Sequence, residues 1–176
     1  MPLPRSPMRC GQYKPHACSV TRADWPAILA LNDEAVQYTG AMDAARLEKL
    51  AAWACYLRVI EREGRIAAFL MGFREGTDYD SPNYIWFNRR FDKFHYVDRV
   101  IVAPEFRGQG LADRLYDDFE AFARTKGAPR ILCEVNVEPP NPASLRFHAR
   151  RGFREIGREP YGAAKIVAMF ERSLNG

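Results

Sequence analysis

The feature that most constrains the fold is a strand, a glycine turn and an amphipathic helix that follow one another in the second half of the chain. Phe94–Val102 reads FHYVDRVIV, an apolar run typical of a strand. After Gly110, large apolar side chains recur at helical spacing, at Leu111, Leu115, Phe119 and Phe122. A second strand is predicted at Arg130–Val137. Two strands joined by one crossover helix run parallel, so this region predicts a parallel pair.

The rest of the chain predicts antiparallel pairing. Strands at Cys55–Glu61 and Arg65–Phe73 flank a short turn that contains Gly64, which favours a hairpin. Two more strands, 154–157 and 164–172, close the chain. Helices are predicted in three further segments: the one that follows the capping pair Thr21 and Asp24, then Asp43–Ala54, then Asn141–Gly152. The aromatic segment 74–94 is interpreted as a long loop.

This order of elements predicts a mixed α/β (α+β) fold. A central mixed, mostly antiparallel sheet would carry helices on both faces. The length of 176 residues suits a single core. We predict one domain at 17–176, preceded by a flexible, proline-containing lead-in at 1–16.

Charge and composition exclude several classes of protein. No apolar run is long enough to cross a membrane, and the first residues lack the apolar core of a secretory signal, so we expect a cytoplasmic protein and no membrane partner. The net charge of +4 is too small to indicate a nucleic-acid partner. The four cysteines show no C-x-x-C spacing and only three histidines are present, so no metal site is predicted. We interpret the cysteines as free thiols.

The glycine turn itself predicts an anion site. The first amide groups of a helix lack partners within the helix, and the helix dipole makes that end positive. Gly108 and Gly110 carry no Cβ, so a phosphate can approach the backbone, and Arg107 adds a positive charge. The spacing matches neither G-x-x-x-x-G-K-[ST] nor G-x-G-x-x-G, which argues against a nucleotide site of those two kinds.

The sequence R-G-Q-G-L-A at 107–112, after V-x-P at 102–104, resembles the first signature of the GNAT superfamily of N-acetyltransferases, [QR]-x-x-G-x-[GA]. A second signature of that family, N-x-x-[AS]-x-x-[FL]-[YH]-x-x-x-G-F, is matched from Asn141 to Phe153. The resemblance covers roughly Ala17 to Leu174. It implies the GNAT fold, whose parallel strand pair is splayed.

The resemblance also implies acetyl-CoA as co-substrate. The pyrophosphate would be held by the turn, and the pantetheine arm by the strand before it. The implied cofactor-binding residues are Arg99, Val100, Ile101, Val102, Arg107, Gly108, Gln109, Gly110, Leu111, Ala112, Asn141 and Phe147. Asn141 has the alternative role of capping its helix.

Direct attack of an amine on the thioester requires a base for the amine and favours an acid for the departing thiolate. We predict Glu134 as the base, because related N-terminal acetyltransferases carry a glutamate in a similar E-V strand, with Asp98 as the second candidate. Either carboxylate has the alternative of neutralising an arginine such as Arg99. His148 stands where many family members have a tyrosine acid, and histidine can do the same work. Its alternative is packing alone.

The acceptor is predicted to be a primary amine, with a small molecule favoured over a protein N-terminus because segment 74–94 is long. Tyr79, Tyr84, Trp86 and Tyr161 are candidates for its pocket, or alternatively part of the core. No cysteine has a recognisable nucleophile setting, so transfer would be direct. The alternative function is a non-catalytic acyl-CoA binding or sensing module. Dimers are common in such families, so the resemblance allows a homodimer.

Overall fold

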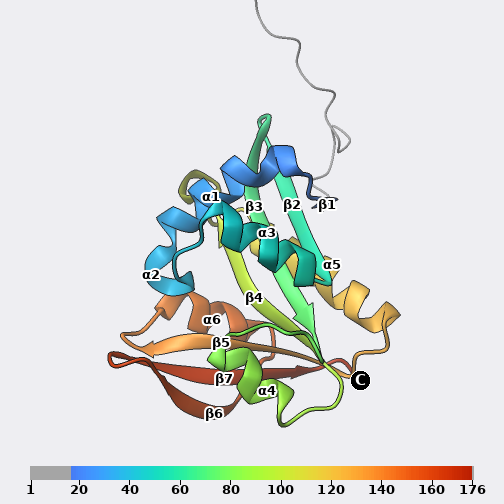
Figure 1. The fold of residues 1–176 in the computed structure, drawn as a ribbon, viewed down its shortest axis with the longest axis vertical. Coiled ribbons are helices and arrows are strands. Elements are labelled where there is room, and N and C mark those ends of the chain that lie inside the picture. Colours follow the sequence, from blue (N-terminus) through green and yellow to red (C-terminus); the bar gives the residue numbers. More distant parts are fainter. Residues whose placement is uncertain (1–16, 176) are drawn as a thin grey trace, which may run out of the picture.

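A computed structural model describes residues 17–175, which form one seven-stranded sheet covered by helices (Figure 1). The strands are ordered β1-β2-β3-β4-β5-β7-β6 across the sheet. The elements are β1 (Cys18–Ser19), η1 (Arg22–Asp24), α1 (Trp25–Glu34), α2 (Val36–Thr39), α3 (Ala44–Trp53), β2 (Tyr56–Arg62), β3 (Arg65–Arg74), α4 (Pro82–Asn88), β4 (His95–Val102), η2 (Pro104–Phe106), α5 (Leu111–Thr125), β5 (Arg130–Glu138), α6 (Pro142–Arg150), β6 (Arg154–Tyr161) and β7 (Lys165–Ser173).

The parallel pair β4–β5 is the centre of the sheet and is splayed, as predicted. Its register contains only two pairs, His95 with Ile131 and Tyr96 with Leu132. All the other neighbouring strands pair antiparallel. Beyond Tyr96 the two strands diverge, so their later residues face a gap between the halves of the sheet instead of each other.

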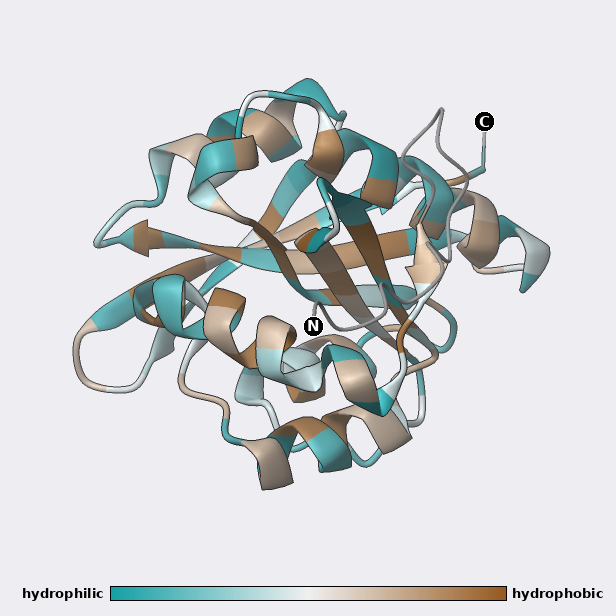
Figure 2. Ribbon diagram, turned by 90° about the horizontal axis from the view of Figure 1, so that it is seen from above, coloured by the Kyte–Doolittle hydropathy of each residue, from teal (hydrophilic) through white to brown (hydrophobic). Residues whose placement is uncertain are grey.

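Helices cover both faces of the sheet. Helices α1 and α3 lie in front of β3 and β4 in Figure 1, whereas α5 lies behind, packed on β2, β3 and β4. Figure 2 shows the apolar strands enclosed between the two helical layers. The stripe predicted for α5 is largely confirmed: Leu111, Leu115 and Phe119 are buried and Phe122 is half-buried. The buried side chains of α5 pack with those of β3 and β4 in the hydrophobic core.

Two helices depart from the predicted order. The short α2 extends the first helical segment, and α4 replaces part of the expected loop at 74–94. Helix α4 begins because Ser81 accepts a hydrogen bond from the Tyr84 amide at 3.5 Å and Pro82 occupies the first helical position. The hairpin β2–β3 is confirmed, and its turn places Glu63 and Gly64 at φ values of 53° and 73°.

Other expectations have mixed outcomes. None of the helices within 17–175 is long and apolar enough to cross a membrane. Cys55 and Cys133 are free thiols as predicted, but Cys18 is disulfide-bonded, so that interpretation was wrong there. The predicted lead-in at 1–16, which includes Cys10, lies outside the described residues.

Gly72 in β3 provides a test of the packing between the sheet and α5. A Cβ at this position would lie 2.7 Å from the Phe119 ring and 3.0 Å from the Tyr96 carbonyl oxygen. Because the core is close-packed, we expect Gly72→Ala to lower the free energy of unfolding by about 1–3 kcal/mol in urea titrations. Adding Phe119→Leu removes the ring edge, so the double variant should show a coupling that recovers part of this loss. Strict additivity of the two losses would contradict this account.

Candidate active site

The divergence of β4 and β5 opens a cavity of about 830 Å³. Its wall contains most of the residues predicted for the site: Asp98, Arg99, Val100, Ile101, Val102, Arg107, Gly108, Gly110, Leu111, Ala112, Glu134, Asn141, Phe147 and His148. The glycine turn, the splayed strands and α6 therefore meet at one place, although they come from distant parts of the sequence. Gln109 is the exception, because it does not line the cavity and its amide reaches the Glu105 carbonyl at 3.4 Å.

The glycine turn has the geometry of an anion site. Gly108 and Gly110 both have φ of 75°, a left-handed conformation that favours glycine. Gly110 precedes the first residue of α5, and no side chain caps this helix. A Cβ at either glycine would meet nothing within 4 Å. The cavity therefore presents the amide groups at the start of a fifteen-residue helix, in open space, at its positive end.

A β-bulge turns Asp98 out of the ladder of β4. Met71 of β3 pairs with Arg99 and Gly72 pairs with Val97, which leaves Asp98 between them without a partner in the register. Its carboxylate accepts a hydrogen bond from Arg99 Nε at 2.6 Å and another from the Tyr79 hydroxyl. Bulges of this kind re-aim a side chain next to a site.

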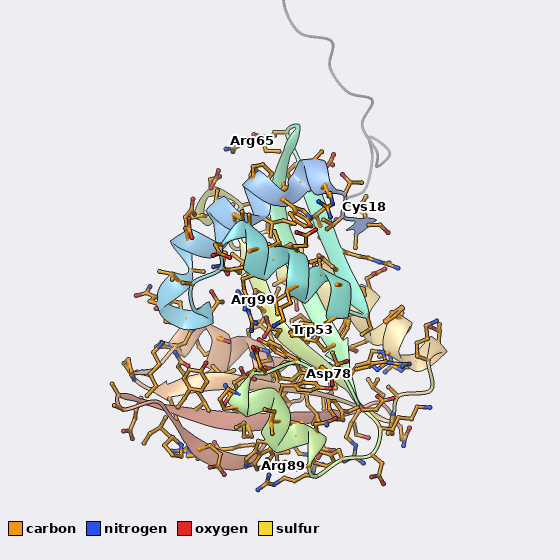
Figure 3. All side chains as sticks on the ribbon, in the orientation of Figure 1. Cys18, Trp53, Arg65, Asp78, Arg89 and Arg99 are labelled. Carbon is orange, nitrogen blue, oxygen red and sulfur yellow. The ribbon has the colours of Figure 1, made fainter. Side chains whose placement is uncertain are left out.

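Arg99 neutralises the charge of Asp98 inside the protein. The side chains of the pair are 6% and 5% exposed, so the ion pair is almost fully buried. Arg99 also donates to Asn32 Oδ1 at 2.7 Å, which ties β4 to α1. In Figure 3 Arg99 lies in the middle of the molecule, among the side chains below α1 and α3. Asp98 therefore neutralises Arg99 in this structure, which is the alternative role considered for it.

Glu134 of β5 has a different environment. Its carboxylate accepts hydrogen bonds from the Tyr96 hydroxyl, at 2.8 Å to Oε2 and 3.0 Å to Oε1. Asn83 Nδ2 donates to Oε1 at 3.0 Å. Burial and the negative charge of Asp98 raise the pKa of Glu134 to about 7, although the two hydrogen bonds oppose that shift. A carboxyl group with this pKa can both accept and release a proton near neutral pH.

His148 of α6 is buried and has both ring nitrogens occupied. Nδ1 lies 2.8 Å from the Ser144 carbonyl oxygen, which can only accept, so Nδ1 carries the proton. Nε2 therefore accepts from the Tyr116 hydroxyl at 2.7 Å. Burial lowers the pKa of His148 to about 4. At neutral pH the ring is uncharged and holds the hydroxyl group of Tyr116, which lines the cavity.

The two remaining residues of α6 have clear packing roles. Asn141 caps the helix by accepting from the Ser144 amide at 3.2 Å, so its alternative role is confirmed, and it also lines the cavity. The Phe147 ring packs edge-on against Tyr116, with ring centroids 5.1 Å apart.

The four aromatic candidates for the acceptor pocket divide into two pairs. Tyr79 and Tyr161 line the cavity. Tyr84 does not, because its hydroxyl donates to the Arg74 carbonyl at 2.6 Å. Trp86 does not either, because its indole donates to Glu159 at 2.7 Å. For these two residues the core alternative is the correct one.

Several residues that line the cavity were not identified from the sequence. They are Ala35, Tyr38, Thr39, Gly40, Ser81, Asn83, Tyr116, Asn136 and Lys165, among others. Tyr116 follows Leu115 on the apolar stripe of α5 and carried no separate signal. Asn83 lies in the segment that was interpreted as a loop. Over residues 17–175 no group of His, Cys, Asp and Glu could hold a metal ion.

The acetyltransferase (GNAT) family matches residues 23–153, which include the sheet centre, the glycine turn and most of the cavity wall. The chain belongs to this family.

Two curated relatives match shorter stretches. A phosphinothricin N-acetyltransferase from Streptomyces coelicolor is 39% identical over 82 residues, which cover 43% of this chain and 46% of the relative. The N-alpha-acetyltransferase 30 of Schizosaccharomyces pombe is 33% identical over 58 residues, covering 33% and 37% of the two chains. The chain thus aligns with less than half the length of each relative.

Solved structures share the fold over nearly the whole chain. Ard1 from Thermoplasma volcanium gives a TM-score of 0.72 at 16% identity, covering 89% of this chain and 95% of that one. A putative acetyltransferase from Salmonella typhimurium, solved with its cofactor acetyl-CoA, gives 0.67 at 18% identity, covering 93% and 95%. These similarities confirm the predicted GNAT fold.

The open space at Gly110 leads to a test of the anion site. We expect Gly110→Ala to weaken acetyl-CoA binding at least about tenfold in calorimetry, because the methyl group would occupy the open space through which an anion would approach the helix amides. Gly64→Ala is the matched control, since Gly64 also has a positive φ of 73° and open space but lies in the β2–β3 turn. Equal affinities of the two variants would contradict this location of the site.

Proposed function

We propose that this protein is an acetyl-CoA-dependent N-acetyltransferase that transfers the acetyl group directly to a primary amine. The observation that carries the proposal is one cavity that joins an uncapped helix start to a carboxyl group poised for proton transfer. The first feature suits a diphosphate, and the second suits the ammonium proton of an acceptor.

Acetyl-CoA would be held along the splayed strand and the turn. The amides at Gly108, Gly110, Leu111 and Ala112 suit the pyrophosphate, and Arg107, which is exposed, adds charge at the mouth. The residues from Arg99 to Val102 line the gap where β4 has no parallel partner, so backbone groups there are available to the pantetheine arm and the acetyl carbonyl.

Glu134 is the proposed base. One ammonium proton passes to the Glu134 carboxylate, the freed amine nitrogen forms a bond to the acetyl carbon, and the bond from that carbon to sulfur breaks. The second proton that the nitrogen must lose passes to the departing sulfur, so coenzyme A leaves as the thiol. Asp98 is less suited to this step, because it is already paired with Arg99 and bonded to Tyr79. Its negative charge instead helps keep the pKa of Glu134 near neutrality.

His148 is proposed to act through Tyr116. A ring that is neutral above a pH of about 4 and bonded at both nitrogens has no proton to spare for a thiolate. It does fix the position of the hydroxyl group of Tyr116, a residue that lines the cavity. We therefore assign His148 a positioning role in place of the acid role predicted from the sequence.

The acceptor is proposed to be a small molecule. Lys165 Nζ donates to the Gln37 carbonyl at 2.9 Å, which joins the start of β7 to α2 beside the cavity. This contact narrows the opening at that side of the cavity, where an extended peptide would need room to enter. Tyr38 and Tyr161 are 46% and 40% exposed and line the cavity. Such exposed aromatic rings suit contacts with a small amine.

Release of free thiol from acetyl-CoA, measured across a panel of small amines, amino acids and peptides, tests the function and the acceptor class together. We expect turnover with small amines and little with peptides. Acetyl-CoA binding without any thiol release across the panel would favour the alternative, an acyl-CoA sensing module. Turnover with peptides alone would contradict the acceptor class.

Glu134→Gln should lower the activity but raise the stability at neutral and higher pH. We expect kcat to fall about 100-fold or more, because the base is lost. The raised pKa means that the folded state binds this proton more tightly than the unfolded state, so wild-type stability falls as pH rises from about 4.5 to about 7. The variant should therefore gain about 2 kcal/mol of stability relative to wild type between pH 5 and pH 8, as measured by urea unfolding.

The control for this change in stability is Asp33→Asn, which removes an exposed acid. It should show no gain that depends on pH. A Glu134→Gln variant with the same pH dependence of stability as wild type would contradict the environment described for Glu134.

Two substitutions of His148 distinguish positioning from acid catalysis. Glutamine can accept a hydrogen bond from Tyr116, so His148→Gln should keep kcat within about threefold of wild type. His148→Ala leaves the Tyr116 hydroxyl unheld and should lower kcat about tenfold, with acetyl-CoA affinity unchanged in both variants. If glutamine is as damaging as alanine, the histidine itself carries a proton and the positioning role is wrong.

A further inference from the structure

Helix α4 is fixed to the part of the sheet that lies beyond the cavity. The Trp86 indole donates to Glu159 of β6 at 2.7 Å. The same ring lies against Gly157, where a Cβ would be only 3.1 Å from it. At the start of the helix, the Tyr84 hydroxyl accepts from the Thr77 amide at 2.9 Å and donates to the Arg74 carbonyl, so the helix is also tied to the end of β3.

These anchors determine which end of α4 meets the cavity. In Figure 3 Arg89, the residue after the helix, lies at the periphery of the molecule. Asn83, the second residue of the helix, is only 6% exposed and lines the cavity. Its Nδ2 donates to Glu134 Oε1 at 3.0 Å. A segment about fifty residues earlier in the sequence therefore reaches the proposed base.

The carboxyl group of Glu134 is surrounded by few charges. From β4 it faces Asp98, which is paired with Arg99, and Tyr96, which donates to it. Tyr79, Tyr116 and Cys133 also feel its charge, since burial and the negative charge of Glu134 both raise the pKa of each of these three. None of these three carries charge at neutral pH. Residue Met169 of β7, which pairs with Glu134, has no titratable group.

Two side chains thus stabilise the ionised carboxylate as donors, Tyr96 and Asn83. Tyr96 belongs to the sheet, on the strand next to Glu134, and is fully buried. Asn83 is the donor that α4 adds from outside the sheet. A neutral amide donor stabilises a carboxylate without cancelling its charge, so Glu134 stays basic enough to take a proton.

We propose that Asn83 is a positioning residue of the transfer reaction, and that α4 serves as an arm which delivers its amide to Glu134 and keeps that carboxylate ionised. This inference rests on the proposed role of Glu134 as base. On this inference, the contacts that hold α4 on β6 support the reaction, because they keep Asn83 beside Glu134.

Direct titration of Glu134 by carbon NMR of the side-chain carboxyl tests the contact without any knowledge of the acceptor. The resonance is assigned by its loss in Glu134→Gln. In Asn83→Leu, which keeps the volume and removes the donor, the midpoint should rise by about one pH unit from its wild-type value near 7. Asn83→Ala is measured as well, so that one destabilised variant does not decide the outcome.

The matched control is Asn88→Ala at the other end of α4. Asn88 Oδ1 accepts from the Gly76 amide at 2.9 Å, so this variant loosens the same helix without removing a donor to Glu134. Its midpoint should stay at the wild-type value. The inference is overturned if both Asn83 variants titrate like wild type, or if Asn88→Ala shifts the midpoint as much as they do.

Kinetics supply the second readout once an acceptor is known. The ratio of kcat/KM of Asn83→Leu to that of wild type should be about one fifth at pH 7. It should return to about one above pH 9, because Glu134 is then ionised in both proteins. A ratio that is low at every pH would indicate a structural role and overturn the inference. A shifted midpoint in a protein without transferase activity would confirm the contact while contradicting the proposed function.

Discussion

The separation of β4 from β5 after only two paired residues is the constraint on which the rest of the site depends. Parallel strands that stayed paired would bury their backbone groups in the ladder and leave no space between the two halves of the sheet. The antiparallel neighbours β3 and β7 hold the two strands in place from outside, so the gap does not close. The helix that connects the strands then has its amino end at the mouth of the gap.

The same gap explains the electrostatics of the cavity. Two carboxyl groups, Asp98 and Glu134, approach from opposite sides of it, and only Asp98 has an arginine. The charge of Asp98 is therefore compensated and that of Glu134 is not, and burial together with the negative charge of Asp98 raises the pKa of Glu134 to about 7. Keeping an uncompensated acid partly buried lowers stability above neutral pH, and a reactive site commonly carries such a cost.

The sequence was sufficient for features that depend on local order. The apolar strand before residue 103, the glycines at 108 and 110, and the Asn141–Pro142 cap identified the sheet centre and the cavity wall, because their spacing follows from backbone geometry. Features that depend on what packs against a residue were not accessible. Nothing local shows that Asp98 lies in a bulge, since the bulge exists only in its register with β3.

His148 and α4 show the same limit in two forms. His148 was expected to act as an acid because it stands where many family members have a tyrosine, but its burial leaves the ring neutral and bonded to Tyr116. The seven residues of α4 are too few to display a helical period, and its aromatic residues read as a loop. Only its Ser81–Pro82 start carried a signal.

The position of α4 also links the two halves of the protein. The sheet is divided by the gap, and few backbone hydrogen bonds cross it. Helix α4 is hydrogen-bonded to the last residue of β3 and to β6, so it joins the first half of the sheet to the edge strand of the second half. A substitution that shifted β6 would therefore also shift Asn83, the residue of α4 that donates to Glu134. The geometry of the base thus depends on contacts made at the far edge of the sheet as well as on those within the cavity.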